Sequence, residues 1–116
     1  MPIIDIEIVD GTVSREVTQA LADGIGRGFA AKPGKVWVRV RTLSADAYAE
    51  NETGAPRPVF VTVTASVPPQ AQELRSRIAW IVEEVSRLTG RPRENIHVEF
   101  QPAAKGRIAF GGKLVE

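Results

Sequence analysis

Hydrophobic and polar residues alternate in four segments of the chain. Segment 3–9, with the sequence IIDIEIV, places Ile4, Ile6 and Ile8 on one side and Asp5 and Glu7 on the other. Segments 36–41, 59–65 and 96–101 alternate in the same way. Because successive side chains of a β-strand point to opposite faces, this period of two predicts four strands, each with one buried face.

Two other segments repeat apolar residues at the spacing of a helix. The first begins after Ser14, which suits the N-cap position, and has Gly24 and Gly28 beside its apolar stripe. We expect this helix to pack closely at its glycines. The second stripe, between positions 74 and 88, follows a Pro-Pro pair and ends before Gly90, which fits the C-terminal cap. The stripe of the first helix consists of Val17, Leu21, Ile25 and Phe29.

The order of these elements is strand, helix, strand, given twice. Matching Val36 with Ile96 aligns the alternation of the second strands, and Pro2 and Pro58 then stand at the start of the two units. We expect a single domain made of two βαβ halves, about 1–57 and 58–116. The predicted fold class is α+β: duplicated βαβ units form a four-stranded mixed sheet with two helices on one face. The uncovered face suits an interface between subunits.

Composition narrows the possible functions. The chain has 116 residues, below a typical domain of about 150, and 15 Lys and Arg against 14 Asp and Glu, a net charge of +1. This balance provides no electrostatic footprint for nucleic acid. The longest apolar runs, such as 78–82, are far too short to cross a membrane, and no leader precedes the first strand. We expect a cytoplasmic protein with neither nucleic-acid nor membrane partners.

The residue types present also limit the chemistry. The chain has no cysteine and a single histidine, His97, which excludes thiolate nucleophiles and centres built on several imidazoles. No cofactor or metal is implied. The opening Met1-Pro2 is the most informative pair, because removal of Met1 leaves Pro2 as a secondary amine at the start of a strand. An α-amine titrates near about 8, and burial or a nearby cation lowers that pKa, which suits proton transfer next to a carbonyl.

Longer stretches of the sequence resemble a known family. The opening MPIIDIEIVDG, the Lys32-Pro33 pair after the first helix, and the closing NIHVEFQPAAKGRIAFGG are similar to the tautomerase superfamily. Its members include 4-oxalocrotonate tautomerase, with one βαβ unit per chain, and macrophage migration inhibitory factor, with two. The resemblance implies a fused two-unit member that assembles as a homotrimer. It also implies a keto-enol tautomerase, in which Pro2, freed of Met1, is the general base that acts on a small keto or enol acid.

Five further residues are candidates for binding the substrate. The resemblance places Lys32 on an active-site lysine of the longer-chain branch, and His97 on a tyrosine that reaches the proline of a neighbouring subunit. Lys32 and Arg39 each carry a cation that suits a substrate carboxylate or carbonyl. Tyr48 in the first half and Phe110 in the second lie near the position of the family's terminal aromatic residue.

Three other readings of the sequence remain open. The two arginines of the short-chain branch fall on Thr12 and His97, which motivates a non-catalytic trimer of the same fold that binds a ligand or a protein. Hydratase, dehalogenase or decarboxylase chemistry would reuse Pro2 with other polar partners. The βαββαβ pattern also allows a ferredoxin-like regulatory or RNA-binding module. However, its outward positions lack aromatic residues flanked by basic ones.

Overall fold

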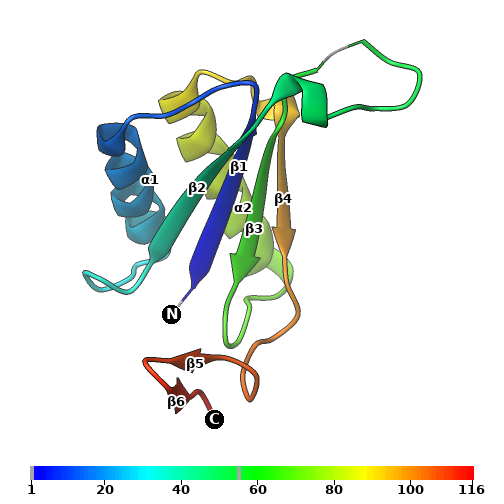
Figure 1. Ribbon diagram of the computed structural model, residues 1–116. Coiled ribbons are helices and arrows are strands. Elements are labelled where there is room, and N and C mark those ends of the chain that lie inside the picture. The colour runs from blue at the N-terminus through cyan, green and yellow to red at the C-terminus, as the bar shows by residue number, and fades with distance from the viewer. Residues whose placement is uncertain (1, 55) are drawn as a thin grey trace.

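The computed structural model describes residues 2–54 and 56–116, and its main sheet has the predicted mixed character (Figure 1). The strand order is β2-β1-β3-β4. The outer pairs, β1 with β2 and β3 with β4, are parallel, whereas β1 and β3 are antiparallel. The four strands are β1 (Ile3–Val9), β2 (Trp37–Leu43), β3 (Val59–Thr64) and β4 (Ile96–Phe100).

Two helices, α1 (Arg15–Gly28) and α2 (Ala71–Thr89), cover the same face of the sheet, as the sequence predicted (Figure 1). Ser14 caps α1 by accepting a hydrogen bond from the Val17 N–H (3.1 Å). Gly90 ends α2 with a φ of 76°, a left-handed conformation that glycine adopts without strain. The core between helices and sheet consists of Ile4, Ile6, Ile8, Leu21, Ile25, Phe29, Val59, Val61, Val63, Ile81, Val85 and Ile96.

The two helices approach each other at the glycines of α1, which confirms the sequence prediction. The indole of Trp80 lies against this surface, and its Nε1 donates a hydrogen bond to the Gly24 carbonyl (2.8 Å). A Cβ atom at Gly28 would lie 2.1 Å from the indole ring. Only glycine at this position allows Trp80 to occupy its place.

Several boundaries and one element differ from the sequence predictions. Strand β2 continues to Leu43, and α2 begins at Ala71 rather than at the Pro-Pro pair. The segments before β3 and β4 include two short 3₁₀ turns, η1 (Ala45–Ala47) and η2 (Arg93–Asn95). A C-terminal hairpin that the alternation did not predict is formed by β5 (Ala109–Phe110) and β6 (Lys113–Leu114). Figure 1 shows it beyond the end of the sheet where β1 begins.

Strand register corrects one correspondence between the two halves. When the second strands are matched as in the sequence, the parallel registers place Pro2 on Val59 rather than on Pro58. Pro58 is fully buried, and its carbonyl accepts a hydrogen bond from the Val9 N–H (3.1 Å). The match of Pro2 with Pro58 is therefore wrong by one residue, because the two prolines differ in both register and burial.

No helix in residues 2–54 and 56–116 is long and apolar enough to cross a membrane.

Candidate active site

The sheet face opposite the helices carries the polar and aromatic side chains in rows that run across the strands. Strand register defines each row, because residues paired across strands point to the same face. The first row lies at the start of β1, and the third at its end. From first to third, the rows are Trp37, Ile3 and Thr64; Arg39, Asp5, Thr62 and Glu99; and Arg41, Glu7, Phe60 and His97.

Pro2 lies at the start of β1, next to an aromatic pair. The Trp37 N–H donates a hydrogen bond to the Pro2 carbonyl (3.2 Å), which fixes this residue to β2. The Trp37 indole meets the Phe110 ring edge to face, with centroids 5.3 Å apart and planes at 88°. Because Phe110 comes from the C-terminal hairpin, the two ends of the chain meet here. Trp37 remains 44% exposed, so this end presents an open apolar surface.

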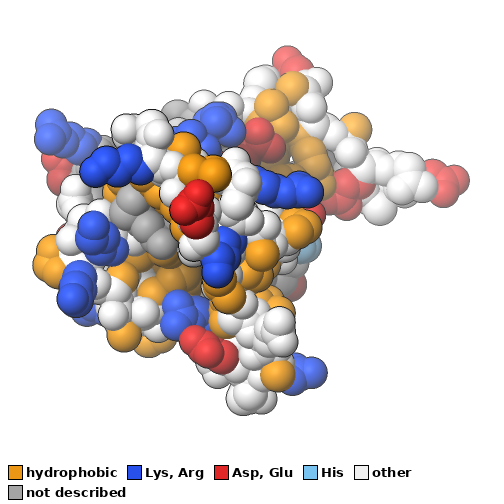
Figure 2. All heavy atoms as spheres, turned by 90° about the horizontal axis from the view of Figure 1, so that it is seen from below, with side chains coloured by type: hydrophobic (Ala, Val, Ile, Leu, Met, Phe, Trp, Pro, Cys, Tyr) orange, Lys and Arg blue, Asp and Glu red, His pale blue; other side chains and the backbone are white. Residues whose placement is uncertain are grey.

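Basic side chains are frequent at this end of the molecule. Figure 2, which looks at the molecule from the end where β1 begins, shows Lys and Arg side chains dispersed among hydrophobic ones, with some acidic side chains between them. The opposite end differs, since the loop after η1 carries Glu50 and Glu52. Cationic side chains attract anions, so this end of the molecule offers groups that can hold an anionic ligand.

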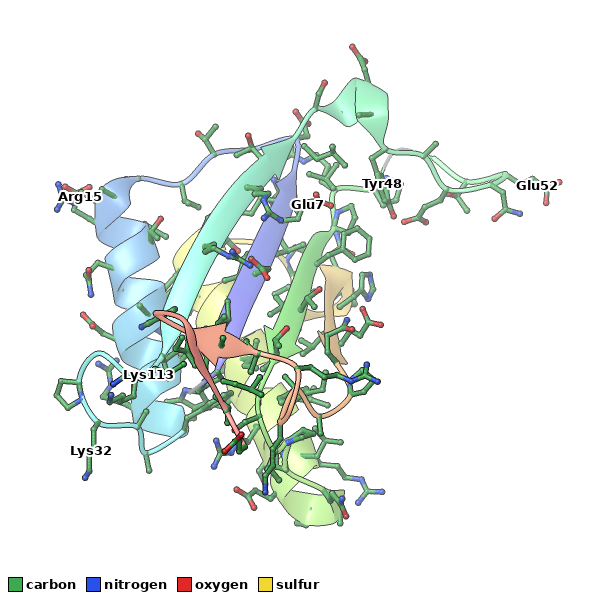
Figure 3. All side chains as sticks on the ribbon, turned by 60° about the horizontal axis from the view of Figure 1, so that its bottom comes forward. Glu7, Arg15, Lys32, Tyr48, Glu52 and Lys113 are labelled. Carbon is green, nitrogen blue, oxygen red and sulfur yellow. The ribbon has the colours of Figure 1, made fainter. Side chains whose placement is uncertain are left out.

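Lys32 occupies the loop between α1 and β2, at the same end of the molecule as Pro2. Its side chain is exposed and points away from the body of the protein (Figure 3). It lines a hollow of about 390 Å³ together with Asp23 and Arg27 of α1. Pro2 does not line this hollow. Within one chain, Lys32 is thus near the Pro2 end but is not directed at Pro2.

Arg39 is held by an acidic neighbour on the second row. Its Nε and Nη2 donate to the two carboxylate oxygens of Asp5, at 2.7 and 2.9 Å. This two-pronged contact is the strong geometry for a guanidinium and a carboxylate. The hydrogen bond and charge of Asp5 raise the pKa of Arg39 further above its usual value. Glu7 and Glu99 lie on the same face of the sheet, but the structure pairs Arg39 with Asp5.

Tyr48 and His97 lie together at the other end of the same face. The Phe60 ring is in contact with both, with centroids 5.8 Å from the Tyr48 ring and 5.6 Å from the His97 ring. The Tyr48 hydroxyl donates to Glu50 (2.5 Å), and this hydrogen bond raises the pKa of Tyr48. Sequence reasoning did not single out Phe60, although its outward position in β3, level with His97, was the available signal.

These two ends are too far apart to form one site within a chain. The third row lies five residues along β1 from Pro2, which corresponds to about 17 Å at about 3.3 Å per residue. The structure therefore links Phe110 to the Pro2 end through Trp37, and Tyr48 to His97 through Phe60, but it does not join the two groups. A joint role for all four residues requires a second copy of the chain. Within residues 2–54 and 56–116, no three His, Asp or Glu side chains gather as metal ligands.

Comparisons with known proteins give similarity at the level of structure. No protein-family model matches the sequence, and no curated protein resembles it. Among solved structures, a homologue of macrophage migration inhibitory factor from Prochlorococcus marinus superposes with a TM-score of 0.81 at 11% identity, covering 98% of this chain and 99% of that one. A fused 4-OT described as a symmetric trimer has a TM-score of 0.79 at 15% identity, covering 97% and 94%.

A third similar structure adds a chemical observation about that protein. Pt0534, described as inactivated by 2-oxo-3-pentynoate, has a TM-score of 0.78 at 17% identity, covering 97% of this chain and 94% of its own. All three matches extend over nearly the whole chain and include both helices and the four-stranded sheet. The chain therefore has the fold of the tautomerase superfamily.

Proposed function

We propose that this protein is a tautomerase-type enzyme that acts on small keto or enol acids through the nitrogen of Pro2. Removal of Met1 would expose that nitrogen as a secondary amine. The observation that carries the proposal is the position of Pro2. Its carbonyl is hydrogen-bonded to β2, and it lies at the end of the sheet that presents the Trp37–Phe110 pair and several basic side chains.

The chemistry follows from a neutral amine beside cations. The Pro2 nitrogen takes a proton from the carbon next to the substrate carbonyl, and the electrons of the broken C–H bond form the enolate. A cation beside the carbonyl oxygen stabilises the developing negative charge, and Lys32 is the candidate for this role. Arg39, further along the sheet, is the candidate for facing a substrate carboxylate. The protonated amine then returns the proton at another carbon or at oxygen. Phe110 and Trp37 provide an apolar wall that excludes water.

A homotrimer completes this site in the proposal. The helices leave one sheet face uncovered, and β2 and β4 are edge strands of the main sheet. Exposed edges and a partly apolar face favour association with further copies. The fused 4-OT with a similar fold is described as a trimer. In such an assembly, Tyr48 and His97 of one copy can approach Pro2 of another, which a single chain does not allow.

The internal symmetry of the chain belongs to the same proposal. Residues 1–57 and 58–116 would be two βαβ halves of one domain, of which only the first supplies a terminal amine. Pro58 is an internal residue with a buried ring. Its amide nitrogen has no free lone pair, so the second half would contribute binding groups such as Phe110 and not a second base.

Two measurements test the proposed function together. Intact mass spectrometry of the purified protein is expected to show the loss of Met1. Ketonisation of 2-hydroxymuconate or phenylenolpyruvate is expected to proceed with the wild type and to fall at least about 100-fold, the usual contribution of a general base, in Pro2→Ala. Pro92→Ala is the matched control, because Pro92 is exposed at the N-cap of η2, at the far end of the sheet. Retained activity in Pro2→Ala would overturn the proposal.

A non-catalytic, ligand-binding trimer is the second candidate. Two observations favour it: Arg39 is hydrogen-bonded to Asp5, and Lys32 points away from the body of the protein. Neither cation is therefore directed at Pro2 within one chain. It predicts that keto acids bind without turnover and that Met1 is retained. The same mass measurement therefore separates the two candidates.

A further inference from the structure

We infer that Asp5 sets the charge of the substrate by occupying Arg39, so that the site takes acids with one carboxylate and an apolar or aromatic tail in preference to dicarboxylates. This inference rests on the proposed function, because it assigns a specificity-determining residue to the Pro2 site. It concerns Asp5, which touches no reacting atom and acts through Arg39.

Geometry places this pair within reach of a substrate at Pro2. Asp5 is three residues from Pro2 along β1, about 10 Å at the usual strand rise. Arg39 lies level with Asp5 on β2, one row beyond Trp37. A substrate whose reacting carbon sits at Pro2 and whose far end follows the strand therefore extends toward the guanidinium of Arg39. The far end is thus the part of the substrate that this row selects.

The charges around Arg39 determine whether the far end of a bound substrate can carry a second carboxylate. Both carboxylate oxygens of Asp5 accept hydrogen bonds from Arg39, at 2.7 and 2.9 Å, so the pair is neutral overall. A second substrate carboxylate would compete with Asp5 for the same guanidinium edge and would be repelled by its charge. Glu99 on the same row adds a negative charge to this face, whereas Glu7 on the next row stands level with Arg41. A dianion is therefore disfavoured, although the residue that usually binds carboxylates is present.

Apolar side chains at the Pro2 end favour a substrate with an apolar or aromatic tail. Trp37 and Phe110 stack edge to face at the Pro2 end, and the indole is 44% exposed. An aromatic or alkyl tail gains contact with these rings without displacing any hydrogen bond. The chemical class expected for this site is thus a monoanionic enol or keto acid with an apolar tail.

A specificity ratio provides the first test. The ratio of kcat/KM for 2-hydroxymuconate, a dianion, to that for phenylenolpyruvate, a monoanion, is measured in the wild type, Asp5→Asn and Glu7→Gln. Asp5→Asn is expected to raise the ratio about tenfold, equivalent to about 1.4 kcal/mol. Glu7→Gln removes the same charge from the same face but leaves the pair intact, and a change below about twofold is expected. Asp5→Ser, which keeps a short polar side chain in the strand, is expected to behave like Asp5→Asn.

If the inference is correct, the higher kcat/KM ratio of Asp5→Asn depends on Arg39. Adding Arg39→Gln to Asp5→Asn is expected to return the ratio to within about twofold of the wild-type value. A ratio that Asp5→Asn leaves unchanged, or a gain that survives Arg39→Gln, would overturn the inference. In that case the wild type would still turn over substrate through Pro2, so the proposed function would stand.

Binding provides a second test that does not need turnover. In the Pro2→Ala background, calorimetry compares muconate, a dianion, with 3-phenylpropanoate, a monoanion. Asp5→Asn is expected to bind muconate about tenfold more tightly and to leave 3-phenylpropanoate unchanged. If the wild type is inactive and this shift is still observed, the proposed function fails while the role of Asp5 stands. If Asp5→Asn does not bind muconate more tightly, the inference fails.

Discussion

Replacing Gly28 by alanine is expected to disrupt the packing of α1 on α2. A Cβ atom there would lie 2.1 Å from Cδ1 and Nε1 of Trp80, well inside van der Waals contact, so the indole has to move. The same Nε1 donates to the carbonyl of Gly24 at 2.8 Å. Displacing the ring therefore costs both its packing and this hydrogen bond.

The magnitude follows from three contributions to the free energy of unfolding. Forcing a methyl group into a filled contact costs about 1–3 kcal/mol, and losing the hydrogen bond of Trp80 costs about 0.5–1.5 kcal/mol. Alanine favours the helical backbone over glycine by up to about 1 kcal/mol. We expect Gly28→Ala to lower the free energy of unfolding by about 2 kcal/mol, because the helical preference of alanine, at about 1 kcal/mol, offsets part of the other two costs.

Urea unfolding followed by circular dichroism measures this change, with an unchanged slope against denaturant as the sign of a pure stability effect. Gly26→Ala is the matched control, because Gly26 lies in the same helix and nothing lies within 4 Å of a Cβ there. That variant is expected to be as stable as the wild type or up to about 1 kcal/mol more stable. Equal stability of Gly28→Ala and Gly26→Ala would refute the close helix packing described above.

Three further variants test the aromatic pair, a helix cap and a surface ion pair. Phe110→Ala is expected to lower kcat/KM for phenylenolpyruvate at least about fivefold, since one ring contact is worth about 1 kcal/mol. Leu114→Ala is the control, because Leu114 lies in the next strand of the hairpin and is 52% exposed. Equal effects of the two variants would contradict the role of the ring. Ser14→Ala removes the cap of α1 and is expected to lower the free energy of unfolding by about 1 kcal/mol, as urea unfolding would show; no change would mean that the cap is dispensable. Arg93 lowers the pKa of Glu83, so their contact stabilises the fold above the unfolded-state pKa of Glu83 and is lost as pH falls through the folded-state value. Glu83→Gln is therefore expected to flatten the acid side of a plot of unfolding midpoint against pH, and an unchanged slope there would contradict this.

Local pattern was enough to predict the layers of the fold. Alternation placed the isoleucines of β1 on the helix side, and Ser14 and Gly90 marked helix ends because their chemistry acts on adjacent backbone groups. Gly24 and Gly28 indicated close helix contact because glycine has no side chain to keep a neighbouring helix away. By contrast, each strand of the C-terminal hairpin has two residues, too few for a period of two to be detected.

The arrangement of the candidate site depends on contacts distant in sequence. Alternation put Arg39 on the outward face together with Asp5, Glu7 and Glu99, so any of the three carboxylates could pair with it. Only strand register shows that Asp5 is the residue level with Arg39. Likewise, nothing local placed Tyr48, in a loop, against Phe60 in β3. The match of Pro2 with Pro58 was wrong because the two parallel pairs have different registers, which a sequence offset does not contain.

A titration of the proline nitrogens tests the account most directly. The chain has eight prolines, and in a protein made with isotope-labelled proline only a residue with a free amino group shows a nitrogen signal that moves with pH. We expect one signal, assigned to Pro2, to titrate with a pKa below about 8, the value of an ordinary α-amine. The absence of any titrating proline signal, or a pKa at or above that value, would contradict a general base at the start of β1.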